Sequence, residues 1–271
     1  MNPDLYTEKS KVQKNYYNET ASRYDEWHID PPSAKIVDFW NFNNLKKFLK
    51  NALPDSQAGH LHKSLELGCG TGRLANSLFQ ISDEVYGVDL SQEVLKIAKD
   101  KYPKLILECS EVVNLSYPDN YFDMVIINGS LHHFFAVEKT FKEAYRVLKT
   151  GGVFVLLGEP NSEFLKPYHP FFYIWAINRI FNRLFSIFNR QHTKQELIEP
   201  DAESYKPWVL KKQLKQAGFD VKFFYTYDYF VRSNNKFLLK FYNPYLNFEN
   251  KTISKIFPYL GLAIQAFSIK K

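Results

Sequence analysis

The chain has 271 residues, of which 45% are hydrophobic, and a net charge of +6. This length and composition allow a large buried core and exclude a disordered protein. The two cysteines are too few for a disulfide framework and lack metal-ligand spacing, so the sequence predicts a reducing compartment. No segment has the roughly 18 apolar residues of a membrane span or the apolar core of a signal peptide, and we expect a cytoplasmic protein.

Basic character is concentrated in the C-terminal part of the chain. Residues 1–160 contain 18 Lys and Arg against 21 Asp and Glu, whereas residues 161–271 contain 17 against 8, so the two parts carry −3 and +9. A positive field attracts anionic partners such as a membrane surface, nucleic acid or a phosphorylated substrate. An A/T-rich coding genome would also enrich lysine, and composition alone leaves both explanations open.

Short apolar runs alternate with helical patterns between residues 64 and 158, which is typical of βαβ units around a parallel sheet. We expect strands at 64–68, 84–89, 104–109, 122–127 and 152–158 and helices at 72–80, 91–101 and 136–148. A later helix is expected at 208–217, followed by strands from Asp220 and near 262–269. Residues 160–206 and 228–260 interrupt this alternation, and we expect them to form insertions or a cap.

Three glycines follow the first expected strand in SLELGCGTG, residues 64–72. In an open parallel sheet, ligands bind beyond the carboxyl ends of the strands, and glycine lets a ligand approach the main chain there. The spacing is G-x-G-x-G, and Arg73 takes the place of the third glycine of a dinucleotide fingerprint. The pattern therefore disfavours a nicotinamide-dependent reductase.

Asp89 ends the second expected strand in VYGVDLS, 21 residues after Gly68. A carboxylate in this position can accept hydrogen bonds from both hydroxyls of a ribose, which a nicotinamide or an adenosyl cofactor would offer. Asp89 could instead cap the next helix, although Ser91 is also available for that role. This residue alone does not decide between the two cofactors.

Five segments, taken together, resemble the class I S-adenosylmethionine-dependent methyltransferases, in particular the group that includes quinone-biosynthesis methyltransferases. They are ELGCGTG at 66–72, GVDLS at 87–91, LSYPDNYFDMV at 115–125, LHHF at 131–134 and RVLKTGG at 146–152. The resemblance covers residues 12–160 and returns at 207–226. It implies an α/β, Rossmann-like, doubly wound sheet of seven mostly parallel strands, with S-adenosylmethionine as the cofactor. The cofactor-binding domain would comprise 1–159 and 207–271, with a helical, aromatic-rich cap at 160–206 and a second insertion at 228–260.

The resemblance also implies roles for individual residues. Glu66 and the glycine turn would receive the methionine portion of the cofactor, with Asp89 on the ribose and Leu90 against the adenine. Glu111, where the group usually has Asp, and the main chain of Val112 would bond the adenine. The segment YNETASRYDEW at 17–27 resembles the group's lid and would place Tyr17, and with it Tyr24, over the cofactor. The cofactor-binding set is Tyr17, Glu66, Gly68, Cys69, Gly70, Gly72, Asp89, Leu90, Glu111, Val112 and Asn128.

Methyl transfer from a sulfonium requires alignment and exclusion of water, and it requires a base only when the acceptor is poorly ionised. Candidate bases are His132 and His133, at the carboxyl end of the fourth expected strand, and Glu159, at that of the fifth. Alternatively, one histidine packs under the next helix and the other faces solvent. The HTKQE stretch from His192 lacks the paired histidines of a zinc site, so we expect no metal.

Residues 177–190 show a two-faced helical pattern within the expected cap. Arg179, Arg183 and Arg190 lie on one face, and isoleucine, leucine and phenylalanine fill the other. This pattern fits a helix on an anionic membrane surface, with peripheral membrane contact through 171–190. It also fits a lid helix packed on the domain. Both interpretations predict an apolar acceptor pocket.

The sequence therefore predicts transfer of a methyl group from S-adenosylmethionine to a hydrophobic or lipid-linked small molecule. A sugar or another polar metabolite is an alternative acceptor, and a non-catalytic scaffold that binds the cofactor is an alternative of a different class. Nucleic acid is not the expected acceptor, because the fourth strand ends in INGS and lacks the N-P-P-Y type of motif.

Overall fold

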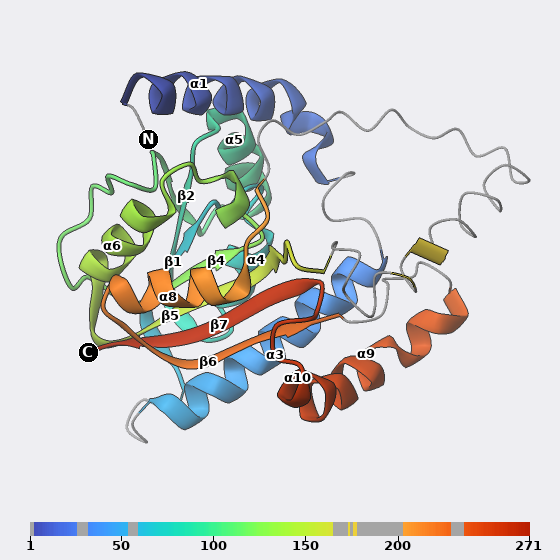
Figure 1. Cartoon of the computed structure of the whole chain (residues 1–271). Coiled ribbons are helices and arrows are strands. Elements are labelled where there is room, and N and C mark those ends of the chain that lie inside the picture. The colour runs from blue at the N-terminus through green and yellow to red at the C-terminus, as the bar shows by residue number, and fades with distance from the viewer. Residues whose placement is uncertain are drawn as a thin grey trace, which may run out of the picture.

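The computed structural model describes residues 3–25, 32–53, 59–164, 173, 176–177, 203–228 and 236–271. A seven-stranded sheet in the order β3-β2-β1-β4-β5-β7-β6 forms its centre (Figure 1). Among the strands of the described residues, β7 alone runs opposite to the shared direction of the other six. The predicted α/β class and the mostly parallel, seven-stranded sheet are therefore confirmed. The strands are β1 (Leu61–Leu67), β2 (Ser82–Asp89), β3 (Ile106–Cys109), β4 (Phe122–Asn128), β5 (Leu148–Pro160), β6 (Phe219–Tyr227) and β7 (Ala263–Lys270).

Helices cover both faces of the sheet, so the central strands are apolar on both sides. On β4, Val125 and Ile127 pack in a core cluster with α6 and α8, whereas Met124 and Ile126 pack with α3 and α4. The helices are α1 (Pro3–Thr20), α3 (Pro32–Ala52), α4 (Arg73–Leu78), α5 (Gln92–Lys101), α6 (Val137–Val147), α8 (Pro207–Gln216), α9 (Lys236–Lys251) and α10 (Ile253–Ile256), with short 3-10 turns η1 (Ala21–Arg23) and η3 (Leu131–His133).

The observed elements follow the predicted order closely between residues 61 and 160. The main difference is β5, which begins at Leu148, before the TGG stretch, and pairs with β4 through a register shift. The helices α1 and α3 were not predicted, and α9 and α10 occupy much of the segment expected to be a second insertion, 228–260. The predicted two-faced helix of the cap lies outside the described residues, apart from Ile177.

Two helices position the functional site. Figure 1 shows α1 at the top of the molecule, where it lies across α5. The other helix, α3, packs on the sheet through Leu45 and Leu49 and on α9 through a cluster that contains Trp40 and Leu246. None of the helices in the described part of the chain is long and apolar enough to cross a membrane.

Candidate functional site

The glycine turn lies between β1 and α4, at the carboxyl edge of the parallel strands. Gly68, Gly70 and Gly72 have φ angles of 70°, 53° and 79°, a region that favours glycine. A Cβ on Gly68 would lie 2.6 Å from the hydroxyl of Ser130, and one on Gly70 would lie 2.9 Å from that of Tyr24. A Cβ on Gly72 would instead contact side chains that pack around α5. The first two glycines therefore let Ser130 and Tyr24 approach the main chain closely, and the third permits close helix packing.

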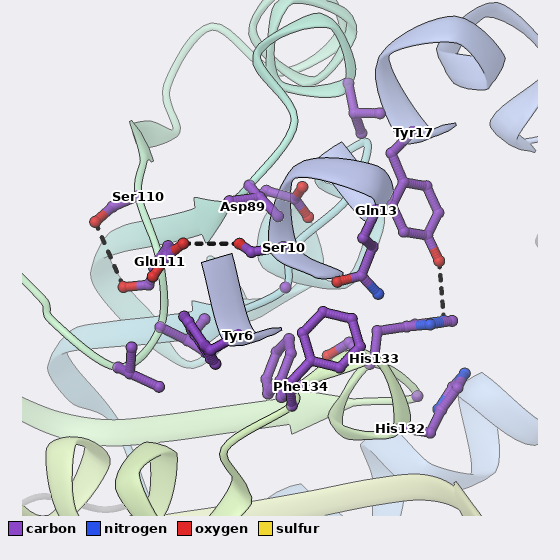
Figure 2. Close-up of a pocket in the computed structure, with 18 of the residues that line it drawn as sticks. Tyr6, Ser10, Gln13, Tyr17, Asp89, Ser110, Glu111, His132, His133 and Phe134 are labelled. Atoms are coloured by element: carbon purple, nitrogen blue, oxygen red, sulfur yellow. Dashed lines mark hydrogen bonds between the residues drawn. The ribbon is translucent and has the colours of Figure 1, made fainter. Parts of the chain in front are cut away.

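Two adjoining pockets open beside this turn. The α1 pocket has a volume of about 170 Å³ and lies between α1 and the ends of β2 and β4 (Figure 2). The α3 pocket has a volume of about 250 Å³ and lies between α3 and the ends of β1 and β4. They share four lining residues, which are Tyr24, Gly68, Gly129 and His132.

The structure brings most of the predicted site residues to these two pockets. The α1 pocket is lined by Tyr17, Gly68, Asp89, Leu90, Glu111, Val112, His132 and His133. The α3 pocket is lined by Glu66, Gly68, Cys69, Asn128 and His132. Gly70 and Gly72 belong to the turn without lining either pocket, and Glu159 also lines neither.

Asp89 is fixed by the main chain at the end of β2. One carboxylate oxygen accepts from the N–H of Gly70 at 2.9 Å and the other from the N–H of Ser91 at 3.0 Å. Burial raises the pKa of Asp89, although these backbone bonds act in the opposite direction. Ser91 caps α5 by accepting from the N–H of Val94, so Asp89 is not the capping residue. A carboxylate has about four acceptor sites, so at least one remains for a ligand beside these backbone bonds.

Glu66 is a carboxyl group with one unsatisfied oxygen. Glu66 is 3% exposed and lines the α3 pocket, and its Oε2 atom has no hydrogen-bond partner. Burial raises the pKa of Glu66 to about 8, against the smaller opposite effect of a backbone bond from Ala75. A buried acceptor without a partner is costly, so this oxygen is suited to a positively charged ligand group.

The two histidines of η3 have different partners. Glu159 is fully buried and accepts from the main-chain N–H groups of Ser130, Leu131 and His132. It also lies 3.0 Å from Nδ1 of His132, which places the proton on Nδ1 and leaves Nε2 as the acceptor. The structure therefore does not support Glu159 as a base that faces the acceptor, because it positions His132 instead. Nε2 of His133 is bonded to the hydroxyl of Tyr17 at 2.9 Å.

Helix α1 contributes site residues that the sequence analysis missed. Figure 2 shows Tyr6, Ser10 and Gln13 beside Glu111 and Phe134, with the hydroxyl of Ser10 donating to Glu111 at 2.7 Å. The helix is also fastened to α5, because the Ser91 hydroxyl donates to Asn18 at 2.7 Å. The resemblance began only at residue 12, within α1, and its lid segment began at Tyr17, so it assigned no role to Tyr6, Ser10 or Gln13.

Helix α3 supplies the opposite wall and was also missed. Val37, Asp38 and Asn41 line the α3 pocket, together with Tyr227 from the end of β6. Asp38 is paired with Arg73, which begins α4. An apolar stripe that includes Trp40, Leu45 and Leu49 is visible in the sequence and could have predicted this helix. Among the described residues, no group of three His, Cys, Asp or Glu side chains could hold a metal ion.

Comparisons with known proteins agree with this geometry. The "Methyltransferase domain" family model matches residues 65–156. A demethylmenaquinone methyltransferase of Chlorobaculum parvum is 27% identical, over 81% of this chain and 92% of that protein. Another, from Symbiobacterium thermophilum, is 31% identical over 57% of this chain and 67% of that protein.

The fold is shared with solved methyltransferase structures. Magnesium protoporphyrin IX methyltransferase from Synechocystis, with SAH bound, superposes with a TM-score of 0.58 at 15% identity, covering 97% of this chain and all of that one. The matched family model, the curated relatives and the fold all agree with the five motifs. The chain thus belongs to the class I S-adenosylmethionine-dependent methyltransferases of the quinone-biosynthesis type, enzymes that use S-adenosylmethionine as their cofactor.

Proposed function

We infer that this enzyme methylates a hydrophobic, lipid-linked quinone-type acceptor. The supporting observation is the similarity to a demethylmenaquinone methyltransferase, which extends over 81% of the chain and therefore beyond the cofactor-binding segment. The name of that relative describes a quinone that lacks a methyl group. We extend this acceptor class to the present chain, with a ring carbon as the methylated atom.

The cofactor fits the polar groups of the two pockets. Asp89 would bind the ribose hydroxyls, and Glu111 would accept from the adenine amino group in place of Ser10. Glu66 would pair with the ammonium group of the methionine portion, which gives its unsatisfied Oε2 a charged partner. Tyr17 from α1 would cover the bound cofactor. The other residues predicted from the sequence to bind the cofactor that line these pockets are Gly68, Cys69, Leu90, Val112 and Asn128.

His132 is the proposed base of the reaction. The cofactor supplies an electrophilic methyl group on a positively charged sulfur. Nε2 of His132 would take the proton of a ring hydroxyl on the reduced acceptor, which places negative charge on the adjacent ring carbon. That carbon would then be the nucleophile toward the methyl group, and loss of its own proton to water would restore the aromatic ring. Glu159 would stabilise the imidazolium from the Nδ1 side.

The chain is proposed to fold as one methyltransferase domain from residues 1–159 and 207–271. Residues 160–206 would form a cap over the acceptor side. The short bridge between Asn161 and Tyr205 supports this division, because it brings the two ends of the segment together. The hydroxyl of Tyr205 also donates to the carbonyl of Leu131, so the end of this segment contacts the histidine turn at 2.8 Å.

The test is a methyl-transfer assay with a short-tailed demethylated naphthoquinol in detergent. Mass spectrometry should detect one added methyl group on the ring and one equivalent of S-adenosylhomocysteine. The variant His132→Gln should bind the cofactor normally and lose most of the turnover. Binding of the cofactor without methylation of hydrophobic quinols contradicts the proposal. Methylation of a sugar would then support a polar acceptor, and no turnover with either class would support a non-catalytic scaffold.

A further inference from the structure

A second large surface feature lies at the other end of α3 from the functional site. This feature, the lysine groove, has a volume of about 1,030 Å³ and runs between α3, β6 and the junction of α9 and α10. Figure 1 shows these helices next to one another along the lower side of the molecule. Its cationic lining residues are Lys47, Lys211, Lys222, Lys251 and Lys255.

The charge of the lysine groove is one-sided. None of the residues that line it in the described part of the chain is acidic. Lys222 is paired with Asp220 at 2.9 Å, whereas Lys47, Lys251 and Lys255 have no ion-pair partner among the described residues. Three exposed lysines from three different helices, α3, α9 and α10, therefore line the same groove. Such an arrangement attracts a surface of several negative charges.

Large apolar side chains are exposed beside these lysines. Phe223 lies in the groove and is 56% exposed, while Ile256 follows Lys255 directly and is 70% exposed. Phe248, one helical turn before Lys251 on α9, is 57% exposed. Exposed apolar residues flanked by lysines are typical of elements that lie in the interface of an anionic membrane. A soluble anion would give these apolar groups no favourable contact.

We propose that the lysine groove and its apolar rim, Phe248 and Ile256, form a docking surface for an anionic lipid bilayer. The lysines would contact lipid phosphates, and the apolar residues would enter the interface between headgroups and acyl chains. The proposal deepens the proposed function, because it identifies the surface that faces the source of a lipid-linked acceptor. Vesicle binding does not require turnover, so it can be tested separately from the methylation reaction.

The helix α3 connects this surface with the functional site. Its first half lines the α3 pocket through Val37 and Asn41, and its second half lines the lysine groove through Asn44 and Lys47. Ten residues separate Val37 from Lys47, which corresponds to about 15 Å along a helix. A bilayer held at the groove would therefore lie close enough for the ring of a long lipid-linked acceptor to enter the pocket while its tail remains in the membrane.

Co-sedimentation with vesicles tests the electrostatic part of the proposal. The parent protein should bind vesicles that contain phosphatidylglycerol, bind pure phosphatidylcholine weakly, and lose binding at high salt. Each lysine at an anionic surface contributes about fivefold, or about 1 kcal/mol, so Lys47→Glu/Lys251→Glu/Lys255→Glu should weaken binding at least about 100-fold. The matched control reverses three exposed lysines elsewhere, Lys104→Glu/Lys139→Glu/Lys142→Glu, and should retain most of the binding.

The apolar rim requires its own variant. Phe248→Ser/Ile256→Ser should weaken vesicle binding roughly tenfold or more while leaving its salt dependence unchanged. Ile106→Ser, which alters a residue 44% exposed on β3, is the control and should have no effect. S-adenosylhomocysteine affinity, measured by calorimetry, should be the same in all of these variants, which shows that they are folded.

Several results would overturn the docking surface. One is a parent protein that ignores anionic vesicles, and another is an equal loss of binding in the groove variant and its charge control. Binding to a polyanion such as single-stranded RNA, without binding to vesicles, would assign the groove to nucleic acid. If vesicle binding occurs without any methylation of quinols, the docking surface stands and the proposed acceptor fails.

Discussion

Cofactor binding is expected to strengthen from about pH 6 to about pH 8, because Glu66 must ionise to pair with the ammonium group of the cofactor. Glu66 is buried, and its burial raises its pKa to about 8. With this pKa, about 1% of the carboxyl groups are ionised at pH 6, about 10% at pH 7 and about half at pH 8. The affinity for S-adenosylhomocysteine should rise about tenfold over the first pH unit and about fivefold over the second.

Isothermal titration calorimetry measures this linkage directly. In two buffers with different ionisation enthalpies, binding at about pH 7 should release about 0.9 protons, because binding ionises the protonated fraction of Glu66. Glu66→Gln keeps the shape of the side chain but cannot ionise, so it should bind weakly, without proton release and with little pH dependence. An affinity in the parent protein that stays constant over this range, without proton release, would refute the pairing of Glu66 with the cofactor.

Three further substitutions test other parts of the site. Asp89→Ala should weaken S-adenosylhomocysteine binding by roughly 1.5 to 3 kcal/mol, because it removes charge-assisted bonds to the ribose, and unchanged calorimetric affinity would exclude Asp89. Gly70→Val should abolish cofactor binding, because even its Cβ would lie 2.9 Å from a tyrosine hydroxyl. Gly151→Val, with the same left-handed backbone strain in open space, should retain binding in the same titration. Glu159→Gln should slow turnover about 100-fold without changing cofactor affinity, since His132 loses a negative partner, and unchanged turnover would indicate a purely structural role.

The parts of the site on strand ends could be predicted from the sequence. Gly68 and Asp89 follow short apolar runs, and parallel strands bring such positions to one edge of the sheet. The residue types then limited the kinds of ligand that the site could bind. Glycine allows a ligand to approach the main chain closely, and a carboxylate accepts hydrogen bonds from hydroxyl groups. Glu159 could be placed at the same edge in this way. The direction in which the Glu159 side chain points could not be predicted. It depends on hydrogen bonds from the main-chain N–H groups of a turn that lies 27 to 29 residues earlier in the chain.

Helix α1 could not be predicted because its site-facing side is polar. Its buried positions include Ser10 and Gln13, and Tyr17 lies two turns after Ser10 on the same side. A helix that packs on a core shows an apolar stripe at this spacing, whereas one that covers a ligand site needs hydrogen-bonding groups there. The polar residues on the site-facing side of α1 suit it to cover a polar cofactor. The same residues remove the apolar stripe by which a helix is recognised in a sequence.

The buried carboxyl of Glu66 should also make the stability of the cofactor-free enzyme fall as pH rises. Its folded pKa of about 8 lies above the ordinary value of 4.5 for a glutamate, so its contribution to stability is fully present below about pH 4.5 and is lost as the pH rises through 8. Between about pH 6 and pH 8 this loss amounts to about 2 kcal/mol. Denaturant unfolding of the parent and of Glu66→Gln should therefore diverge over this range, with the variant the less sensitive to pH. Saturating S-adenosylhomocysteine should remove the difference in slope, because its ammonium group stabilises the ionised form. Parallel pH curves for the two proteins without cofactor would show that Glu66 is already ionised in the folded state.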